Sequence, residues 1–257
     1  MRALFTRLSH YVEISEAHWS AMSEVKIETR TIEPHMDLLG EGDEMRSVFL
    51  LEKGWAIRHR TLEDGRRQIV NFLLPGDFFD LQVFLARRSD HAVSTVTQAK
   101  IHFIDPPSLL SLLKTQSDLA IAIWWATLQE EAILREQIVR TGRRTALERV
   151  AHMILELHRR SRIVNQGSDT AFILPLTQSV LADALGLSLV HVNRTLRSLI
   201  RSGLIDRDGA TILIRNRRGL QDLCGFDTDY LHLDASMDDF KLRFPWAENP
   251  ELCLATE

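Results

Sequence analysis

Residues 176–205, LTQSVLADALGLSLVHVNRTLRSLIRSGLI, contain two short helical patterns joined by a tight turn. Thr177 suits the N-cap of the first pattern, because its hydroxyl can accept a hydrogen bond from a free backbone N–H. Gly186 ends that pattern, since glycine turns sharply there without steric cost. The apolar face of the first pattern consists of Leu181, Ala184 and Leu185. The stretch therefore predicts two helices connected by a glycine turn.

The second pattern begins after Ser188, which again suits an N-cap. Its inward face consists of Val192, Leu196 and Leu199. Its outward stripe consists of Val190, Arg194, Arg197 and Arg201. A helix that buries one face and presents arginines on the other suits the major groove of DNA. Leu189 and Val190 are apolar, so exposure to water does not stabilise them, but they could contact thymine methyl groups in DNA. We therefore favour a DNA-reading helix over the alternative, a surface helix with solvated arginines.

The net charge of −4 is unevenly distributed along the 257 residues. Residues 1–134 contain 14 Lys and Arg against 19 Asp and Glu, whereas residues 135–218 contain 15 against 7. Residues 219–257 contain 2 against 9. The basic block includes the helix–turn–helix pattern, as binding to phosphates through counterion release requires.

Cysteine use and motif content exclude several classes of protein. The two cysteines, Cys224 and Cys253, form neither a disulfide framework nor a four-ligand metal or iron–sulfur set. The amino-terminal residues lack the apolar segment of a signal peptide, and the longest apolar run, residues 119–128, is too short to span a bilayer. No catalytic motif is present. We expect a cytoplasmic protein that is not an enzyme, with no metal site and no membrane contact.

Residues 36–104 are typical of short β-strands. The turns fall at regularly spaced glycines, Gly42, Gly54, Gly65 and Gly76. Between and after them lie β-rich runs at 47–51, 55–60, 68–74, 92–97 and 100–104. Regular short strands with turn signals predict an antiparallel β-roll, or jelly roll.

Helical patterns flank this block. Residues 8–24 predict a short helical region with Ile14, Trp19 and Met22 as buried points, and Ser108 suits the cap of another short helix. Residues 117–141 predict a helix of about 37 Å. Its first half is apolar almost all round, at Leu119, Ile121, Ile123, Trp124 and Trp125. We expect the β-roll to cover one side and a second copy of the chain the other; the alternative is a solitary core helix.

The remaining segments complete an α+β fold. Residues 142–144 indicate a hinge, and Thr145 with Glu148 forms a capping box that opens a helix to about residue 158. Residues 204–205 and 211–214, around Asp208-Gly209, predict a hairpin wing. We therefore expect a β-roll sensor domain at 8–116, a dimerisation helix at 117–141, a winged helix-turn-helix domain at 142–220 and an acidic extension at 221–257.

This organisation resembles the Crp/Fnr family of bacterial transcription regulators over roughly residues 10–220. The resemblance is carried by FLLEKGWAIRHR (49–60), DGRRQIVNFLLPGDFF (64–79) and LADALGLSLVHVNRTLRSLIRSGLI (181–205). It implies a homodimer whose cyclic-nucleotide-binding-like β-roll senses a signal and whose long helices relay it to DNA-binding domains. It also implies RNA polymerase as a partner.

The family's DNA contacts fall on defined residues of this chain. Those that would face bases are Leu189, Val190 and Arg194, with Arg194 expected to bond guanine through two hydrogen bonds. Those at phosphate or flanking positions are Thr177, Gln178, Ser179, Ser188, His191 and Arg197. We add Asn193 to this DNA-binding set.

The family's effector positions differ from those of its cyclic-AMP-binding members. Where those have Gly-Glu and Arg-Ser pairs, this chain has Asp80, Leu81, His91 and Ala92, and the long-helix positions are Leu134 and Arg135. Leucine cannot accept a ribose hydrogen bond, and neutral histidine is a poor phosphate ligand. We therefore expect no cyclic AMP at this pocket, where Asp80 and His91 could instead form a salt bridge.

Other cofactors can be weighed by their ligands. An iron–sulfur cluster is excluded, because no cysteine precedes Cys224. Binding of haem is not excluded by the residues present. The alternative is that the histidines that could serve as axial ligands are ordinary packed or exposed side chains. These candidates are His35, His59, His91 and His102.

Three further charged segments have less specific interpretations. We expect Arg66 and Arg67 to be solvated at a hairpin tip, and Arg159, Arg160 and Arg162 either to extend the phosphate-binding surface or to lie in a solvated loop. The acidic extension, with Tyr230, Phe240 and Trp246, is either docked or partly disordered, with a partner contact as the alternative.

The sequence thus predicts a dimeric regulator that binds an inverted-repeat operator in double-stranded DNA, with an effector that it does not identify. The alternative is a ligand-binding regulatory module that acts through protein contacts rather than DNA.

Overall fold

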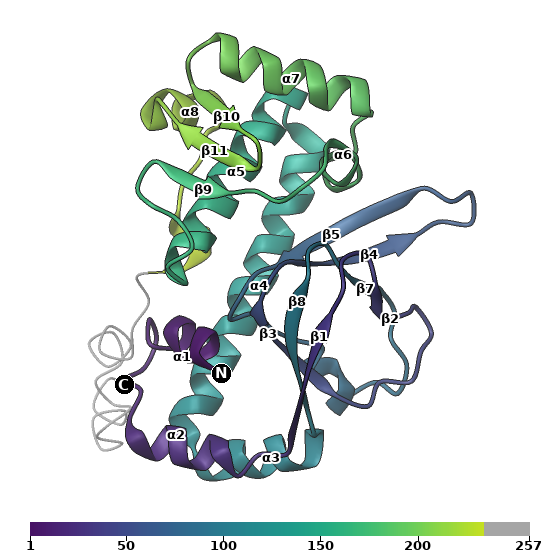
Figure 1. Cartoon of the computed structure of the whole chain (residues 1–257), viewed down its shortest axis with the longest axis vertical. Coiled ribbons are helices and arrows are strands. Elements are labelled where there is room, and N and C mark those ends of the chain that lie inside the picture. Colours follow the sequence, from purple (N-terminus) through teal and green to yellow (C-terminus); the bar gives the residue numbers. More distant parts are fainter. Residues whose placement is uncertain (234–257) are drawn as a thin grey trace, which may run out of the picture.

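The computed structural model describes residues 1–233, which are organised around one long helix (Figure 1). This helix, α4 (Ser117–Arg143), has 27 residues and is two residues longer than expected, so that Gly142 lies within it. A β-roll lies beside its middle, a helical cluster at one end and the carboxy-terminal domain at the other (Figure 1). In the described part of the chain, no helix combines the length and apolarity needed to cross a membrane.

The β-roll consists of two four-stranded antiparallel sheets, with orders β1-β8-β3-β6 and β2-β7-β4-β5. Its strands are β1 (Ile27–Ile32), β2 (Asp37–Leu39), β3 (Val48–Lys53), β4 (Ala56–Thr61), β5 (Arg67–Leu73), β6 (Phe78–Phe79), β7 (Ala92–Thr95) and β8 (Ala99–Ile104), with a 3-10 turn η1 (Leu81–Phe84). Leu51, Phe79 and Ile101 belong to the apolar cluster of the roll. Gly54 joins β3 to β4 with φ +88°, and a Cβ there would lie 2.4 Å from the carbonyl oxygen of Gln98. The expected antiparallel roll is therefore present.

The strands β1, β2 and β6 have no counterpart in the runs expected from the sequence. Along β1, the four central side chains are all exposed, so its sequence IETRTI shows no apolar alternation. The strand pairs with β8 over six residues, and its central side chains add polar and cation–π contacts, from Thr29 to His102 and from Arg30 to the ring of Phe103. Hydrophobic periodicity therefore does not predict this edge strand.

The helical cluster consists of α1 (Arg2–Leu8), α2 (Glu16–Ser23) and α3 (Pro106–Thr115). The helical region expected at 8–24 contains α2, but helix begins there only at Glu16, and α1, which ends at Leu8, was not expected. Met22 is buried as expected, whereas Trp19 is 45% exposed and packs its ring edge against Phe5. The cap of α3 is Asp105, which accepts a hydrogen bond from the backbone N–H of Ser108, and not Ser108 itself.

The carboxy-terminal domain has a winged helix-turn-helix architecture. Its elements are α5 (Ala146–Ile163), β9 (Ala171–Ile173), α6 (Gln178–Leu185), α7 (Leu189–Arg201), β10 (Ile205–Asp208), β11 (Thr211–Ile214), α8 (Arg217–Cys224) and η2 (Asp229–Leu231). The capping box of Thr145 and Glu148 is present, and the helix that it opens continues to Ile163 rather than 158. β10 and β11 form the expected hairpin, which β9 extends to three strands. The helix α8 crosses residue 220, so the expected boundary of the extension falls inside a helix.

This domain packs directly on the β-roll. Ile69 and Phe72 of β5 belong to the same apolar cluster as Ile154 of α5 and Leu181 of α6. Arg67, expected to be solvated, pairs instead with Asp183 of α6 at 2.8 Å. The two domains therefore share a core.

The helix α4 is covered only in part. Its buried side chains in the first half, Leu119, Ala122, Ile123 and Ala126, join a cluster with residues of α1, α3 and the β-roll. The side chains of Trp124, Leu128, Ile138 and Val139 are exposed, Trp124 by 60% and Ile138 by 72%. An apolar stripe along α4 is thus left open to solvent.

Candidate nucleic-acid interface and the interior of the β-roll

The helices α6 and α7 form as the local sequence dictates. The Thr177 hydroxyl accepts a hydrogen bond from the backbone N–H of Val180 at 3.2 Å, and the Ser188 hydroxyl accepts one from that of His191 at 3.3 Å. Gly186 ends α6 in the left-handed conformation with φ +61°. Both expected caps and the expected turn are confirmed.

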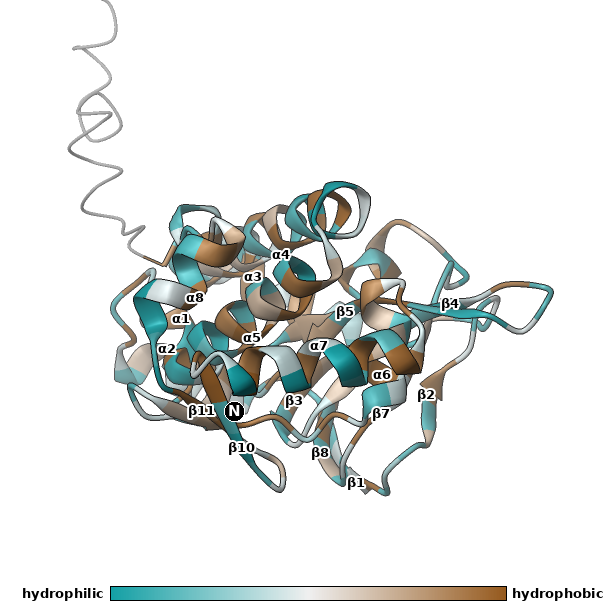
Figure 2. Ribbon diagram, turned by 90° about the horizontal axis from the view of Figure 1, so that it is seen from above, coloured by the Kyte–Doolittle hydropathy of each residue, from teal (hydrophilic) through white to brown (hydrophobic). Residues whose placement is uncertain are grey.

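The two faces of α7 also match the expectation. Val192, Leu196 and Leu199 are buried in the domain core. On the other face, Val190 is 75% and Leu189 52% exposed. The guanidinium groups of Arg194, Arg197 and Arg201 are exposed as well, and none of them forms an ion pair within residues 1–233. Figure 2 looks onto this end of the molecule, where apolar and polar segments alternate along α7.

A shallow hollow of about 790 Å³ follows the outward face of α7. Its lining residues are Gln178, Leu189, Val190, Asn193, Arg194, Arg197, Ile200 and Arg201. The carboxamide of Asn193 donates a hydrogen bond from Nδ2 to Oε1 of Gln178 at 3.0 Å, which links α7 to α6. Six of the ten residues of the expected DNA-binding set therefore line one concave surface.

The other four lie at the helix starts. Thr177 and Ser188 cap α6 and α7, His191 contacts the Ser188 hydroxyl through Nδ1 at 3.1 Å, and Ser179 is exposed in the first turn of α6. The expected set omits two residues that line the hollow, Ile200 and Arg201. Arg201 belongs to the outward arginine stripe expected from the sequence, and the signal for Ile200 is its position seven residues after Asn193, on the same helical face.

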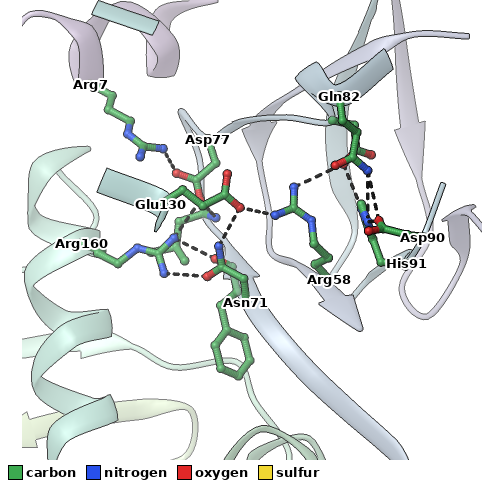
Figure 3. Close-up of polar contacts among 12 residues, drawn as sticks. Arg7, Arg58, Asn71, Asp77, Gln82, Asp90, His91, Glu130 and Arg160 are labelled. Carbon is green, nitrogen blue, oxygen red and sulfur yellow. Dashed lines mark hydrogen bonds and ion pairs between the residues drawn. The ribbon is translucent and has the colours of Figure 1, made fainter. Parts of the chain in front are cut away.

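The interior of the β-roll holds the expected contact between Asp80 and His91. His91 Nε2 lies 3.0 Å from Asp80 Oδ1, and its Nδ1 lies 2.8 Å from Asp90 Oδ1 (Figure 3). The guanidinium of Arg58 reaches the same Asp80 oxygen at 3.3 Å. The guanidinium of Arg58 is therefore already in contact with the Asp80 carboxylate, next to His91.

These contacts continue into a buried polar network that joins four parts of the fold (Figure 3). Arg58 of β4 also pairs with Glu130 of α4, which accepts a hydrogen bond from Asn71 of β5 at 3.1 Å. Arg160 of α5 donates to Asn71 at 3.4 Å and to Asp77 at 2.9 Å. Asp77 in turn pairs with Arg7 of α1. We name these residues, Arg7, Arg58, Asn71, Asp77, Asp80, His91, Glu130 and Arg160, the interior network.

The interior network overturns one expectation and, apart from the contact between Asp80 and His91, was not predicted. Arg160 was expected on the surface or in a loop, but it is 6% exposed and lies in α5. Burial lowers the pKa of Arg7 and of Arg160. Burial also opposes the charge of Arg58, but Glu130 and Asp80 outweigh it and raise the pKa of this guanidinium. No sequence motif announces such a set, since its members are spread over residues 7–160.

A hollow of about 340 Å³ lies beside the network. Of the six expected effector-pocket residues, Asp80, Leu81 and Leu134 line it, whereas His91, Ala92 and Arg135 do not. Arg135 pairs with Glu131 on the surface of α4 instead. The charged lining consists of Arg58, Asp80, Glu130 and Glu131, so carboxylates outnumber guanidinium groups. These residues do not fit the phosphate of a cyclic nucleotide, because Arg58 is already paired with two carboxylates.

The candidate haem ligands have different surroundings. His59 contacts the Ser94 hydroxyl at 2.7 Å and His102 contacts the Thr29 hydroxyl at 2.8 Å. His91 lies between Asp80 and Asp90, and His35 is exposed. Across residues 1–233, no three His, Cys, Asp or Glu side chains gather as ligands for a metal ion.

The first part of the acidic extension is docked at the junction of α4 and α5. The Tyr230 hydroxyl donates a hydrogen bond to Glu156 at 2.8 Å, and Glu156 pairs with Arg140 of α4. Burial and Glu156 raise the pKa of Tyr230. The ring of His152 packs against those of Phe226 and Tyr230, which also contact each other. Burial together with Arg140 and Arg144 lowers the pKa of His152 to about 2. Phe240, Trp246 and Cys253 lie outside the described residues.

Comparisons with known proteins agree with this architecture. Residues 148–223 match the family model of the Crp-like helix-turn-helix domain, and residues 29–116 match that of the cyclic nucleotide-binding domain. These two matches define a two-domain transcription regulator.

Individual relatives identify the family of regulators more closely than the two domain matches do. It is 30% identical over 188 residues to the nitrogen fixation regulation protein FixK of Azorhizobium caulinodans, covering 73% of this chain and 75% of that one. It is 28% identical over 204 residues to the transcriptional activator protein FnrL of Cereibacter sphaeroides, covering 78% and 82%. The solved structure of FixK2 from Bradyrhizobium japonicum superimposes with a TM-score of 0.70 at 28% identity, covering 77% of this chain and 97% of that one. The chain belongs to the Crp/Fnr family of transcription regulators, and α6 and α7 are the helix-turn-helix of its DNA-binding domain.

Proposed function

We propose that the protein is a homodimeric regulator that binds an inverted-repeat operator through α7 of each protomer. The observation that carries this proposal is the outward face of α7, where three exposed arginines have no ion partner among the described residues. Exposed cations without internal partners are free to bind the phosphates and base edges of DNA. A regulatory module that acted only through protein contacts would have no use for this arrangement.

The dimer is supported by the open apolar stripe of α4. Trp124, Leu128, Ile138 and Val139 lie on one helix and are exposed in the single chain. Two such helices packed together would bury these side chains and place two copies of α7 on one side of the DNA. Adjacent major grooves on that side are roughly 34–36 Å apart, so the half-sites would be separated by one helical turn.

Individual residues receive roles from their positions on α6 and α7. Arg194, which lines the hollow, would bond guanine, and Leu189 and Val190 would contact bases. Thr177, Gln178, Ser179, Ser188, His191 and Arg197 would contact phosphates or flanking positions. Such a regulator works in the cytoplasm, with RNA polymerase as its partner at the promoter.

The β-roll would act without cyclic AMP and without an iron–sulfur cluster. The support is the interior network, in which Arg58 is already neutralised by Asp80 and Glu130. A phosphate entering there would have to displace both carboxylates.

Selection from a random DNA pool, with no ligand added and at near-physiological salt, tests this function. We expect an inverted repeat, with an affinity that falls steeply as salt rises. Ile138→Asp should shift the protein from dimer to monomer in sedimentation and weaken binding to the full repeat more than to a half-site. Failure to enrich any sequence, with or without cell extract, would contradict the proposal.

A further inference from the structure

The carboxamide of Asn193 is held in a fixed position on the DNA-facing side of the domain. Its Nδ2 donates one hydrogen bond to Oε1 of Gln178 at 3.0 Å. Both side chains are half-buried and line the hollow along α7. The hydrogen bond spans two helices, so the side chain of Asn193 is restrained before any DNA arrives.

The remaining hydrogen-bonding groups of Asn193 are free. A carboxamide has one acceptor oxygen and two N–H donors, and only one donor is used. Within the described residues, Oδ1 and the second N–H of Nδ2 have no partner. Adenine offers the matching pair in the major groove, an N6 donor and an N7 acceptor.

The neighbours of Asn193 on α7 fit the same base pair. Val190 lies three residues earlier, one helical turn away, and is 75% exposed. The partner of adenine is thymine, whose C5 methyl group also lies in the major groove and favours apolar contacts. Amide and valine together therefore complement both edges of an A·T pair.

We infer that Asn193 reads adenine, that Gln178 positions its carboxamide, and that Val190 contacts the thymine methyl of the same half-site. Each half-site should therefore contain an A·T pair read by Asn193 as well as the G·C pair that Arg194 reads. This inference rests on the proposed function and specifies its operator.

Atom-level changes in the DNA test the inference without altering the fold of the protein. In the selected operator, 7-deazaadenine removes the N7 acceptor, and uracil in place of thymine removes the methyl group. We expect 7-deazaadenine to weaken binding of the wild-type protein by about 5- to 150-fold per half-site, and Asn193→Ala to be insensitive to it. Val190→Ala should be insensitive to uracil but should still respond to 7-deazaadenine.

Variants of Gln178 separate positioning from direct contact. Gln178→Ala should lose most of the preference for adenine at that position, with the preference for guanine at the Arg194 position unchanged. Any phosphate contact that it also loses should weaken all sequences alike, so the readout is the base preference and not the affinity. Gln221→Ala, at a half-buried glutamine of α8 in the same domain, is the matched control and should change neither preference.

The outcomes distinguish this inference from the function beneath it. If the wild-type protein enriches an operator but tolerates 7-deazaadenine at every adenine, the reading of adenine by Asn193 is wrong and the regulator stands. If Asn193→Ala keeps the wild-type response to 7-deazaadenine, the assignment is also overturned. If no operator is enriched at all, the proposed function itself fails.

Discussion

The arginines of α7 and those of the interior network occupy opposite environments. Arg194, Arg197 and Arg201 are exposed and have no ion partner within residues 1–233. Arg7, Arg58 and Arg160 are buried, and each pairs with a carboxylate of another element. Breaking a buried pair leaves an uncompensated charge, whereas an exposed arginine is solvated by water. One group of arginines thus holds the domains together, and the other is available to an external anion.

The same contrast separates the two hollows. The hollow along α7 is lined by arginines without partners and by exposed apolar side chains. The hollow beside the interior network is lined by groups that already neutralise one another, with carboxylates in excess. An anionic ligand therefore suits the first and not the second. The predictions below test this difference, from the largest effect to the smallest.

Removing a carboxylate from the interior network should have the largest effect. Asp77→Ala leaves Arg7 and Arg160 buried without their shared partner, and should lower the free energy of unfolding by about 3–5 kcal/mol. Asp64→Ala is the control, because Asp64 pairs with Arg66 at an exposed turn, where such a pair contributes about 0–1 kcal/mol. Urea unfolding measures both. Equal losses would show that the two environments do not differ.

Removing an arginine from α7 should weaken DNA binding and leave the stability of the fold nearly unchanged. Arg194→Ala should cost about 1–3 kcal/mol of operator binding and relax specificity at one base step in each half-site. The free energy of unfolding should change by no more than about 0.5 kcal/mol, because the side chain is exposed. Fluorescence anisotropy and urea unfolding give the two values. A variant that binds its operator as tightly and selectively as the wild type would refute the base contact.

Arg197→Ala should act on affinity without changing sequence preference. A lost phosphate contact weakens all sequences alike and lowers the slope of log affinity against log salt by about 1 per contact. Arg58→Met, in the interior network, is the comparison: it should leave that slope unchanged if the protein still folds. A change of base preference in Arg197→Ala would place this residue on a base instead.

The smallest effect should be a dependence of stability on pH that arises from His158. This ring of α5 contacts the carbonyl of Ser168 at 2.9 Å and Arg217 at 3.4 Å, and burial lowers its pKa from 6.5 to about 4. Between pH 6.5 and about 4, the imidazole of His158 is protonated in the unfolded chain but stays neutral in the folded chain. Stability should therefore decline from pH 6.5 to about 4.

His158→Gln should make the fall in the free energy of unfolding between pH 7 and pH 5 smaller, because one protonation site is lost. The fall that remains should come from the other buried histidines. Urea unfolding at pH 7 and pH 5 measures it. An unchanged difference between the two pH values in the variant would exclude His158 as its source.

The local elements could be predicted from the sequence because their signals are local. Caps at Thr177, Ser188 and Thr145, the left-handed Gly186 and the two faces of α7 all lie within a few residues of what they control. The strands β3, β4, β5, β7 and β8 were found because β-rich runs between regularly spaced turn glycines are also local signals. The edge strand β1 was missed because its central side chains are all exposed.

The long-range contacts could not be predicted. Arg160 and Arg67 look like solvated charges in the sequence, but they meet Asp77 and Asp183, 83 and 116 residues away. Arg58, Asn71 and Glu130 converge only once β4, β5 and α4 are packed together. Half of the expected effector pocket, Asp80, Leu81 and Leu134, does line one hollow, because those positions were carried over from a family with the same fold.

The most direct test of the account is methylation of the selected operator by dimethyl sulfate, with and without the protein. This reagent modifies guanine N7 in the major groove and adenine N3 in the minor groove. If α7 of each protomer lies in the major groove, guanine N7 should be protected at two positions related by the symmetry of the repeat, and Arg194→Ala should lose that protection. Protection of adenine N3 alone, or none at either groove while the protein is bound, would contradict the central claim.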